Sequence, residues 1–367
     1  MFIVDNLNKV QTEALKQYWI ALIDVLCNES SCTVDQLTNS AEGDELFRSI
    51  GYDNPDVLLL RWLRARKFDV NAAVQQLVDT LKWREQWGVN ALLSKGENDL
   101  LQEEILSGKT YFMGYDKEGR PVSYIHVQDH IKDQYPIEAT EKLGIFSVET
   151  GRKLLKDSIE VGSVVVDMNG FGMQNMDYQL VRFFIQLLEN YYPESLGVVL
   201  IIHAPFIFHS CWAVIRYWLD PVVESKIHFL KHNDDLTKFI DRHFLPKRLS
   251  GTHPDFQYLP PTEHERDMIA AFHADKQGRK LARAAHRRAV RQYLDLTFKW
   301  ANSNDNNQSL IDQRQEAGKQ LRQAFEGYVP YIHTRTHYHR AGLIHEPIFD
   351  IAYEKLRLKH ELNIVEF

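Results

Sequence analysis

The sequence predicts an α/β protein with a helical N-terminal lobe, a central α/β lobe and a mainly helical C-terminal extension. Three observations predict it: helical periodicity up to about residue 100, alternating strand and helix patterns from Gly108 to Leu230, and a change of composition after Pro261. They place the domains at residues 1–100, 101–260 and 261–367. Apolar residues make up 44% and charged residues 25% of the 367 residues, which is ordinary for a globular chain.

The N-terminal lobe reads as a small bundle of helices. Pro55 is tolerated in the first turn of a helix that continues through VLLLRWLRARKF. Asp69 is placed to cap a second helix, which Gly88 ends. The apolar positions of that helix step by three and four residues, at Val70, Ala73, Val74, Leu77, Val78 and Leu81.

The central lobe begins with a hairpin signal, the turn Asp116-Lys117-Glu118-Gly119 between two strand-like segments. Strand and helix patterns then alternate, which indicates a sheet with mostly parallel pairing. The expected helices are 138–156, 176–191 and 207–219, and the expected strands are 161–168, 198–203 and 226–230.

The C-terminal extension is predicted as a helix over 262–300, a polar loop over 301–310 and mixed helix and extended structure over 311–367. Lys276 to Arg291 contains seven Lys or Arg and no Asp or Glu. We expect the apolar side of this helix to pack on the central lobe with Arg283, Arg287 and Arg291 outward. Contact with an anionic membrane or partner is the alternative. The apolar side consists of Ala282, Ala285, Ala289, Tyr293 and Leu296.

Charge and cysteine content indicate which partners and which cellular location to expect for the chain. A net charge of −7 argues against a general nucleic-acid binder, and three cysteines without a CxxC pair favour a reducing, cytoplasmic location. The N-terminus lacks the features of a signal peptide. Residues 195–215 contain no Lys, Arg, Asp or Glu, but Gly197, Pro205 and two histidines interrupt the run. We therefore expect a protein that visits membranes without crossing them.

Catalytic motifs do not appear in the sequence, so we expect a protein that is not an enzyme and needs no cofactor. One histidine-rich segment approximates the spacing of metal ligands. Histidines at these separations cannot all lie on one helix face, and no cysteine supports them, so we expect no metal site. The segment contains His333, His337, His339, His345 and Glu346.

The segment from Asn190 to Leu230 is the most informative part of the chain. Glu194 and Lys226 bracket an apolar strand and the helix FIFHSCWAVIRYWL, which is apolar nearly all round. Such a helix is either deeply buried or in contact with lipid. The two charges are either a structural salt bridge or the groups that receive a polar ligand head while the apolar elements take its tails.

Six ordered segments between residues 55 and 252 form a recognisable series: LLLRWLRARKFDVNAAVQQL, YDKEGRPV, VVVDMNG, ENYYPESLGVVLIIHAPFIF, WLDPVVESKI and FLPKRLSG. Together they resemble the CRAL-TRIO family, in particular its phosphatidylinositol-transfer branch. The resemblance covers about residues 55–252. It implies an α/β lipid-binding lobe in which the sheet forms the floor of the pocket and a mobile helix forms its lid.

The resemblance also implies ligand-binding residues. The inositol-phosphate grip falls on Arg66, Lys67, Glu194 and Lys226, where cations pair with the phosphodiester and the carboxylate accepts from inositol hydroxyls. Three residues before Lys226 the family often has Thr, and this chain has Val223. Helix 207–219 is the candidate lid. Its expected membrane contacts are the aromatic residues Trp212, Tyr217 and Trp218.

The family's phosphatidylcholine site is not matched by this chain. Its tyrosines and hydroxyl residues correspond here to Phe112, Ser123, Gly162 and Val164, although a shift of one residue would bring Ser163 into the site. A choline head needs aromatic faces around its quaternary cation, so we expect it to be held poorly.

The expected function is to bind one phospholipid, phosphatidylinositol, and to transfer it between membranes or present it to lipid-metabolising enzymes. The expected partners are that lipid or another, transiently a membrane surface, and a lipid kinase or other protein. Two alternatives stay open. One is a carrier or sensor of a sterol, a squalene-like hydrocarbon, a fatty acid or haem, with Tyr124 or His126 as a haem ligand. The other is a ligand-free interaction scaffold, against which Glu194 and Lys226 argue.

Overall fold

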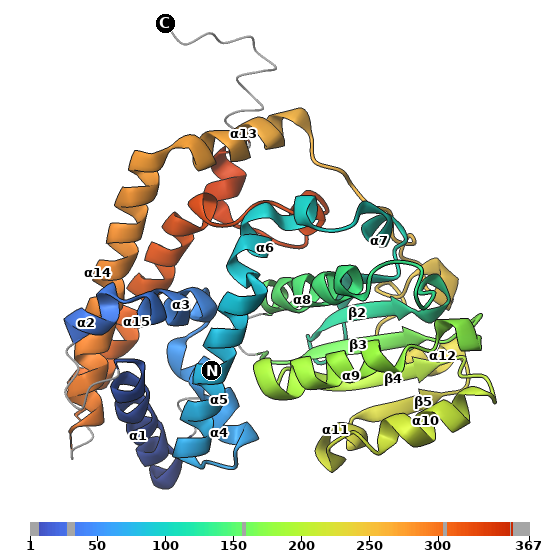
Figure 1. Ribbon diagram of the computed structural model, residues 1–367, viewed down its shortest axis with the longest axis horizontal. Helices are drawn as coiled ribbons and strands as arrows, with labels where there is room; N and C mark the ends of the chain where they lie inside the picture. Colours follow the sequence, from blue (N-terminus) through green and yellow to red (C-terminus); the bar gives the residue numbers. More distant parts are fainter. Residues whose placement is uncertain (1–6, 28–33, 156–158, 304–306, 353, 355–367) are drawn as a thin grey trace, which may run out of the picture. The chain divides into compact units, whose positions relative to one another are not determined.

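The computed structural model describes residues 7–27, 34–155, 159–303, 307–352 and 354 (Figure 1). The chain divides into two compact units, Met1–Lys95 with Pro261–Phe367, and Gly96–Pro260. Cys32, one of the three cysteines counted above, and residues 355–367 of the predicted C-terminal extension lie outside the described residues. Within the described part, no helix has both the length and the apolar character needed to cross a membrane.

The first unit is helical, as predicted. Asn54 caps the helix that begins at Pro55, and the Asp69 side chain accepts from the amide of Ala72 (3.0 Å) to cap the next. Gly88 ends that helix in the left-handed conformation, with φ 70°. The helices of this unit are α1 (Lys9–Leu26), α2 (Val34–Asn39), α3 (Ala41–Ile50), α4 (Pro55–Ala65), α5 (Val70–Trp87), α6 (Val89–Lys95), α13 (Glu263–Ala274), α14 (Lys276–Ala301), α15 (Gln308–Tyr328) and α16 (His337–Arg340).

The basic helix α14 packs on α1 and α2 of its own unit, where its Tyr293 ring meets that of Trp19 at 5.9 Å. Arg287 binds Asp44 (2.8 Å), Arg283 binds the same carboxylate, and Arg291 binds Asp35 (2.7 Å). These arginines were expected to point outward, and the structure pairs them with carboxylates of their own unit. The sequence shows that α14 has an apolar side, but the partner of that side is set by packing.

The second unit contains one five-stranded sheet of order β1-β2-β3-β4-β5 (Figure 1). β1 and β2 form the predicted antiparallel hairpin, in which Gly119 supplies the positive φ of 81°. The following pairs are parallel, as expected from the alternation with helices. The strands are β1 (Thr110–Tyr115), β2 (Pro121–His126), β3 (Gly162–Asp167), β4 (Leu196–Ile202) and β5 (Ile227–Leu230).

The helices of the second unit are α7 (Gln102–Leu106), α8 (Ile137–Leu154), α9 (Tyr178–Gln186), α10 (Phe208–Arg216), α11 (Pro221–Ser225) and α12 (Asn233–Leu236). Two predicted helices are divided. The expected helix 176–191 is α9 followed by a π-helical segment, Leu187–Tyr191. The expected helix 262–300 breaks at Asp275, whose side chain accepts from the Gly278 amide (2.7 Å) and so begins α14.

The two faces of the sheet differ in burial. On the buried face, Tyr111, Tyr124, Val165 and Leu200 lie in one cross-strand row and are almost inaccessible. Apolar side chains from the chain after β5 cover them, namely Leu236, Phe239, Ile240, Phe244, Leu245, Leu249 and Phe256. This face is therefore part of the buried core of the unit.

Candidate functional site

The opposite face of the sheet, here called the half-buried face, is apolar but incompletely covered. One cross-strand row consists of Phe112, Ser123, Val164, Val199 and Ile227, and each of these side chains keeps part of its surface accessible. The row on the buried face directly beside it is closed from Tyr111 to Leu200. An apolar surface with this partial access can receive a hydrophobic ligand.

Three helices lie over the half-buried face. α8 approaches β1 so closely that a Cβ on Gly151 would lie 2.8 Å from the Phe112 ring. α9 and α10 pack on β3, β4 and β5 in one apolar cluster that includes Ile201, Phe208 and Ile215. Figure 1 shows α9 alongside β3 and β4, and α10 beside β5.

α10, the candidate lid, rests on the edge strand of this face. The Trp212 ring meets the Phe229 ring edge-on at 5.1 Å, and Trp218, just after α10, meets Tyr178 of α9 at 5.8 Å. Both tryptophans are half-buried in the cluster. α10 is thus held by apolar contacts with α9 and β5, without a described hydrogen bond from either indole.

The outer side of the α10 region carries exposed aromatic side chains. Tyr217 is 90% exposed and Phe206 is 89% exposed, and Val222 of α11 is also exposed. Tyr217 was named from the sequence, whereas Phe206 was missed because it precedes the helix. Its position beside Pro205, in a loop that must turn out of β4, was the available signal. Exposed aromatic rings of this kind suit contact with a membrane interface.

Asp167 ties the end of β3 to the start of this loop. Its carboxylate accepts from the Asn169 amide (3.0 Å) and bonds His203 Nδ1 (2.8 Å), while His126 Nδ1 lies 3.4 Å away. Burial opposes ionisation, but these hydrogen bonds hold the pKa of Asp167 well below its usual range. His203 adopts φ 59°, so an ionised carboxylate anchors a strained residue where the chain leaves the sheet towards α10.

Glu194 and Lys226 lie at the same edge of the sheet, just before the adjacent parallel strands β4 and β5. Lys226 Nζ donates to the carbonyl of Leu196 (2.8 Å), two residues after Glu194, and an ammonium group has two further donors. Glu194 has φ 54°, and its carboxylate has no hydrogen bond or ion pair with another described residue. The structural salt bridge considered above is therefore not formed in the described part of the chain.

Arg66 and Lys67 belong to the helical unit. Arg66 ends α4 and its Nε donates to the side chain of Gln76 (2.8 Å), and Lys67 follows with φ 52°. Both side chains are exposed and available to an anion. Their part in ligand binding stays a prediction.

Strand register resolves the positions assigned to the choline site. Phe112, Ser123 and Val164 are cross-strand partners on the half-buried face, and Gly162 lies two residues before Val164 on the same strand. Ser163 points to the other face, where its hydroxyl donates to Asp116 (2.6 Å). A one-residue shift that would bring Ser163 into this row is excluded by the alternation of a β-strand.

The residues considered as haem ligands lie on the buried face. Tyr124 donates to the carbonyl of Phe244 (3.1 Å), and His126 bonds the Tyr111 hydroxyl (3.1 Å) on one side and faces Asp167 on the other. In the histidine-rich segment His339 bonds Thr336 and Glu346. Within the described ranges, no group of three or more metal-ligating side chains converges.

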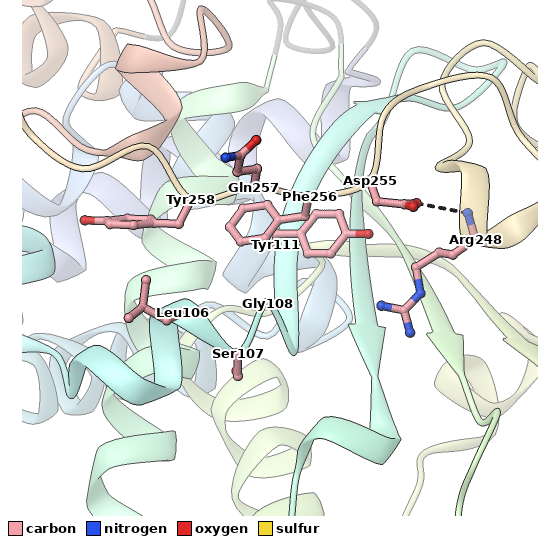
Figure 2. A pocket seen from close by; sticks show the side chains of 9 residues that line it. All are labelled: Leu106, Ser107, Gly108, Tyr111, Arg248, Asp255, Phe256, Gln257 and Tyr258. Atoms are coloured by element: carbon pink, nitrogen blue, oxygen red, sulfur yellow. Dashed lines mark hydrogen bonds between the residues drawn. The ribbon is translucent and has the colours of Figure 1, made fainter.

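A small cavity of about 330 Å³ lies behind the buried face (Figure 2). The ring of Tyr111 stacks on Phe256 at 4.6 Å there, and the Asp255 carboxylate accepts from the Arg248 amide (2.9 Å). This volume is at the lower end of the range for drug-sized ligands, so the cavity cannot hold two acyl chains. It is separate from the half-buried face.

Comparison with known proteins decides the family. Residues 106–251 match the CRAL/TRIO domain, and residues 13–79 match the CRAL/TRIO N-terminal domain. A CRAL-TRIO domain-containing protein of Schizosaccharomyces pombe is 34% identical over 302 residues, which are 81% of this chain and 67% of the relative. The chain belongs to the CRAL-TRIO family. This confirms the resemblance and the predicted fold, and the family is one of lipid-binding and lipid-transfer proteins.

Other CRAL-TRIO relatives carry names that refer to lipids or secretion. The phosphatidylinositol transfer protein CSR1 of Eremothecium gossypii is 30% identical over 323 residues, 84% of this chain and 73% of the relative. The SEC14 cytosolic factor of Kluyveromyces lactis is 29% identical over 248 residues, 59% of this chain and 78% of the relative. The match to the Eremothecium gossypii relative is longer than the two CRAL/TRIO domains together.

Proposed function

We propose that this CRAL-TRIO protein binds one molecule of phosphatidylinositol on the half-buried face, and transfers it between membranes or presents it to lipid-metabolising enzymes. The observation that carries the proposal is a partly accessible apolar floor that ends, at one edge, in Glu194 and Lys226. Acyl chains lie on the floor, and the polar head lies at the charged edge. The name of the Eremothecium gossypii relative supports this choice of lipid.

Head-group recognition follows from the chemistry at that edge. The Glu194 carboxylate, which has no partner among the described residues, accepts hydrogen bonds from inositol hydroxyls, and the remaining donors of Lys226 reach the phosphodiester. Arg66 and Lys67 add positive charge to the phosphate in this proposal, an assignment that rests on the resemblance alone. Because Phe112, Gly162 and Val164 provide neither a tyrosine cage nor hydroxyls, phosphatidylcholine is disfavoured.

Movement of α10 gives the lipid a way in and out. A phosphatidylinositol buries on the order of thirty methylenes at about 0.8 kcal/mol each, so the apolar cover must close over it. α10 with Trp212 and Trp218 provides that cover, and Tyr217 with Phe206 touches the membrane during exchange. Lipid exchange makes and breaks no covalent bond.

Mass spectrometry of lipid extracted from the purified protein is the experiment that tests the proposal. The chain is produced in a eukaryotic host that makes phosphatidylinositol, and a folded variant with Glu194→Gln and Lys226→Ala serves as the control. Phosphatidylinositol at close to one molecule per chain, lost in the control, is expected. A sterol, a hydrocarbon or a fatty acid in the extract would overturn the proposal in favour of another lipid carrier. An empty protein would overturn it in favour of an interaction scaffold.

A further inference from the structure

The N-terminal half of α14 has a charge arrangement that disfavours the helix itself. Its first turn has no acidic residue, and Lys276, Arg279 and Lys280 lie where the helix dipole favours negative charge. The N-cap carboxylate of Asp275 is already bonded to the Gly278 amide. Lys276 and Lys280 are four residues apart, a spacing at which like charges repel.

Ion pairs with carboxylates of the same unit explain the presence of some cations of α14. They do not explain Lys276, Arg279 and Lys280. Arg283 and Arg287 are bound by Asp44, and Arg291 by Asp35 and Asp295. Four other cations in the first half of α14 are exposed, and none has a hydrogen bond or ion pair from its side chain to another described residue. They are Lys276, Arg279, Lys280 and Arg288.

An apolar side chain lies among these cations. Leu281 is 60% exposed and is next to Lys280 and two turns before Arg288. The residues of α14 that belong to the buried core follow Arg288 along the chain, at Ala289, Val290, Tyr293 and Leu294. The set Lys276, Arg279, Lys280, Leu281 and Arg288, here called the outer basic face, therefore takes no part in that core.

We propose that the outer basic face binds the surface of membranes containing anionic phospholipid. It is positive on a chain whose net charge is −7, so it is a local feature with its own complementary partner. Each Lys or Arg near such a surface strengthens binding roughly fivefold. The exposed Leu281 contacts the apolar boundary below the head groups.

The neighbouring groove distinguishes a flat lipid surface from a nucleic acid. Between α14 and α15, a groove of about 480 Å³ contains the carboxylates Asp295 and Glu316 beside Arg288, Arg291 and Lys299. A polyanionic strand lying in the groove would meet both carboxylates. A membrane surface touches only side chains that protrude from the helix. It therefore contacts the cations of the outer basic face without contacting Asp295 and Glu316.

The test is sedimentation of the full chain with phosphatidylcholine vesicles that do or do not contain phosphatidylserine. Lys276, Arg279, Lys280 and Arg288 are replaced together by Gln. We expect binding to the phosphatidylserine vesicles to fall by more than about tenfold, and wild-type binding to weaken as salt rises. A matched control removes the same charge from exposed lysines elsewhere, with Gln at Lys9, Lys82, Lys132 and Lys231.

The outcomes separate this inference from the proposed lipid exchange. Phosphatidylinositol content, measured by extraction from the same quadruple variant, is expected to be unchanged, because none of the four residues belongs to the proposed site. Binding equal to that of the wild type, or an equal loss in the control variant, would overturn the proposal. Binding lost together with the circular dichroism of the native chain would also overturn it, because these side chains would then be structural.

Discussion

Arg314 and Asp56 form a buried ion pair between residues 258 positions apart, with Arg314 Nη2 2.6 Å from Asp56 Oδ1. Trp19 Nε1 donates to the same carboxylate (2.7 Å), and the Arg314 guanidinium lies over the Trp300 ring at 4.3 Å. The pair joins α15 of the C-terminal extension to the start of α4. The first and last parts of the chain therefore form one core.

Arg314→Ala is expected to lower the free energy of unfolding by about 3–5 kcal/mol, because it leaves the Asp56 carboxylate buried without its cation. Urea denaturation followed by circular dichroism measures the change. Lys319→Ala is the control on the same helix, since that exposed lysine only pairs with Glu316 at 3.5 Å, and we expect a change below about 0.5 kcal/mol. Equal stability of the two variants would contradict this role.

Glu194→Gln and Lys226→Ala are each expected to reduce phosphatidylinositol transfer between vesicles about ten- to a hundredfold, the value of a lost hydrogen bond to a charged group. Lys231→Ala, just beyond the opposite end of β5, removes an exposed cation and should leave transfer unchanged. Circular dichroism checks that each variant is folded. Wild-type transfer by a folded double variant would remove both residues from the site.

Phosphatidylcholine transfer is expected to be negligible beside phosphatidylinositol transfer. The half-buried face has Phe112 and Val164 where a choline site needs a hydroxyl or an aromatic cage, and Ser163 faces away. Vesicles that carry both lipids with different labels measure the two rates in one reaction. Equal rates would mean that other residues form a choline site.

Phe206→Ser combined with Tyr217→Ser is expected to slow transfer by about tenfold or more, because two exposed rings no longer enter the membrane interface. The amount of lipid extracted from the purified variant should not change. Val10→Ser, which changes an exposed apolar residue of α1, is the control.

Trp218 is expected to contact the membrane as well. In a chain with Trp218 as its sole tryptophan, brominated lipid should quench the fluorescence, and no quenching would exclude contact by Trp218.

Stability is expected to fall between pH 6.5 and about 4 through His286. Burial among Phe325 and Tyr328 lowers the pKa of His286 to about 4, whereas the unfolded chain takes up the proton near pH 6.5. The buried neutral imidazole of His286 makes its full contribution to the free energy of unfolding above pH 6.5. This contribution is lost as the pH falls, by up to about 3 kcal/mol. His286→Gln should flatten this part of the pH dependence, and an unchanged slope would assign it to other groups.

The sequence by itself determined the elements of the fold and the family. Local signals set them: the caps at Asn54 and Asp69, the left-handed Gly88, the turn at Gly119, and strands that alternate with helices. Glu194 and Lys226 were named because they bracket an apolar strand and helix and match the family, and the structure places both just before neighbouring parallel strands.

The tertiary structure decided which surfaces meet. It placed Ser163 on the buried face and Val164 on the half-buried one, left Phe206 exposed, and packed α14 on α1 and α2. It also paired Arg314 with Asp56, which no local pattern indicates. Backbone caps and turns act over a few neighbouring residues, whereas an apolar stripe or a buried charge fixes its partner only when distant segments compete for the same core.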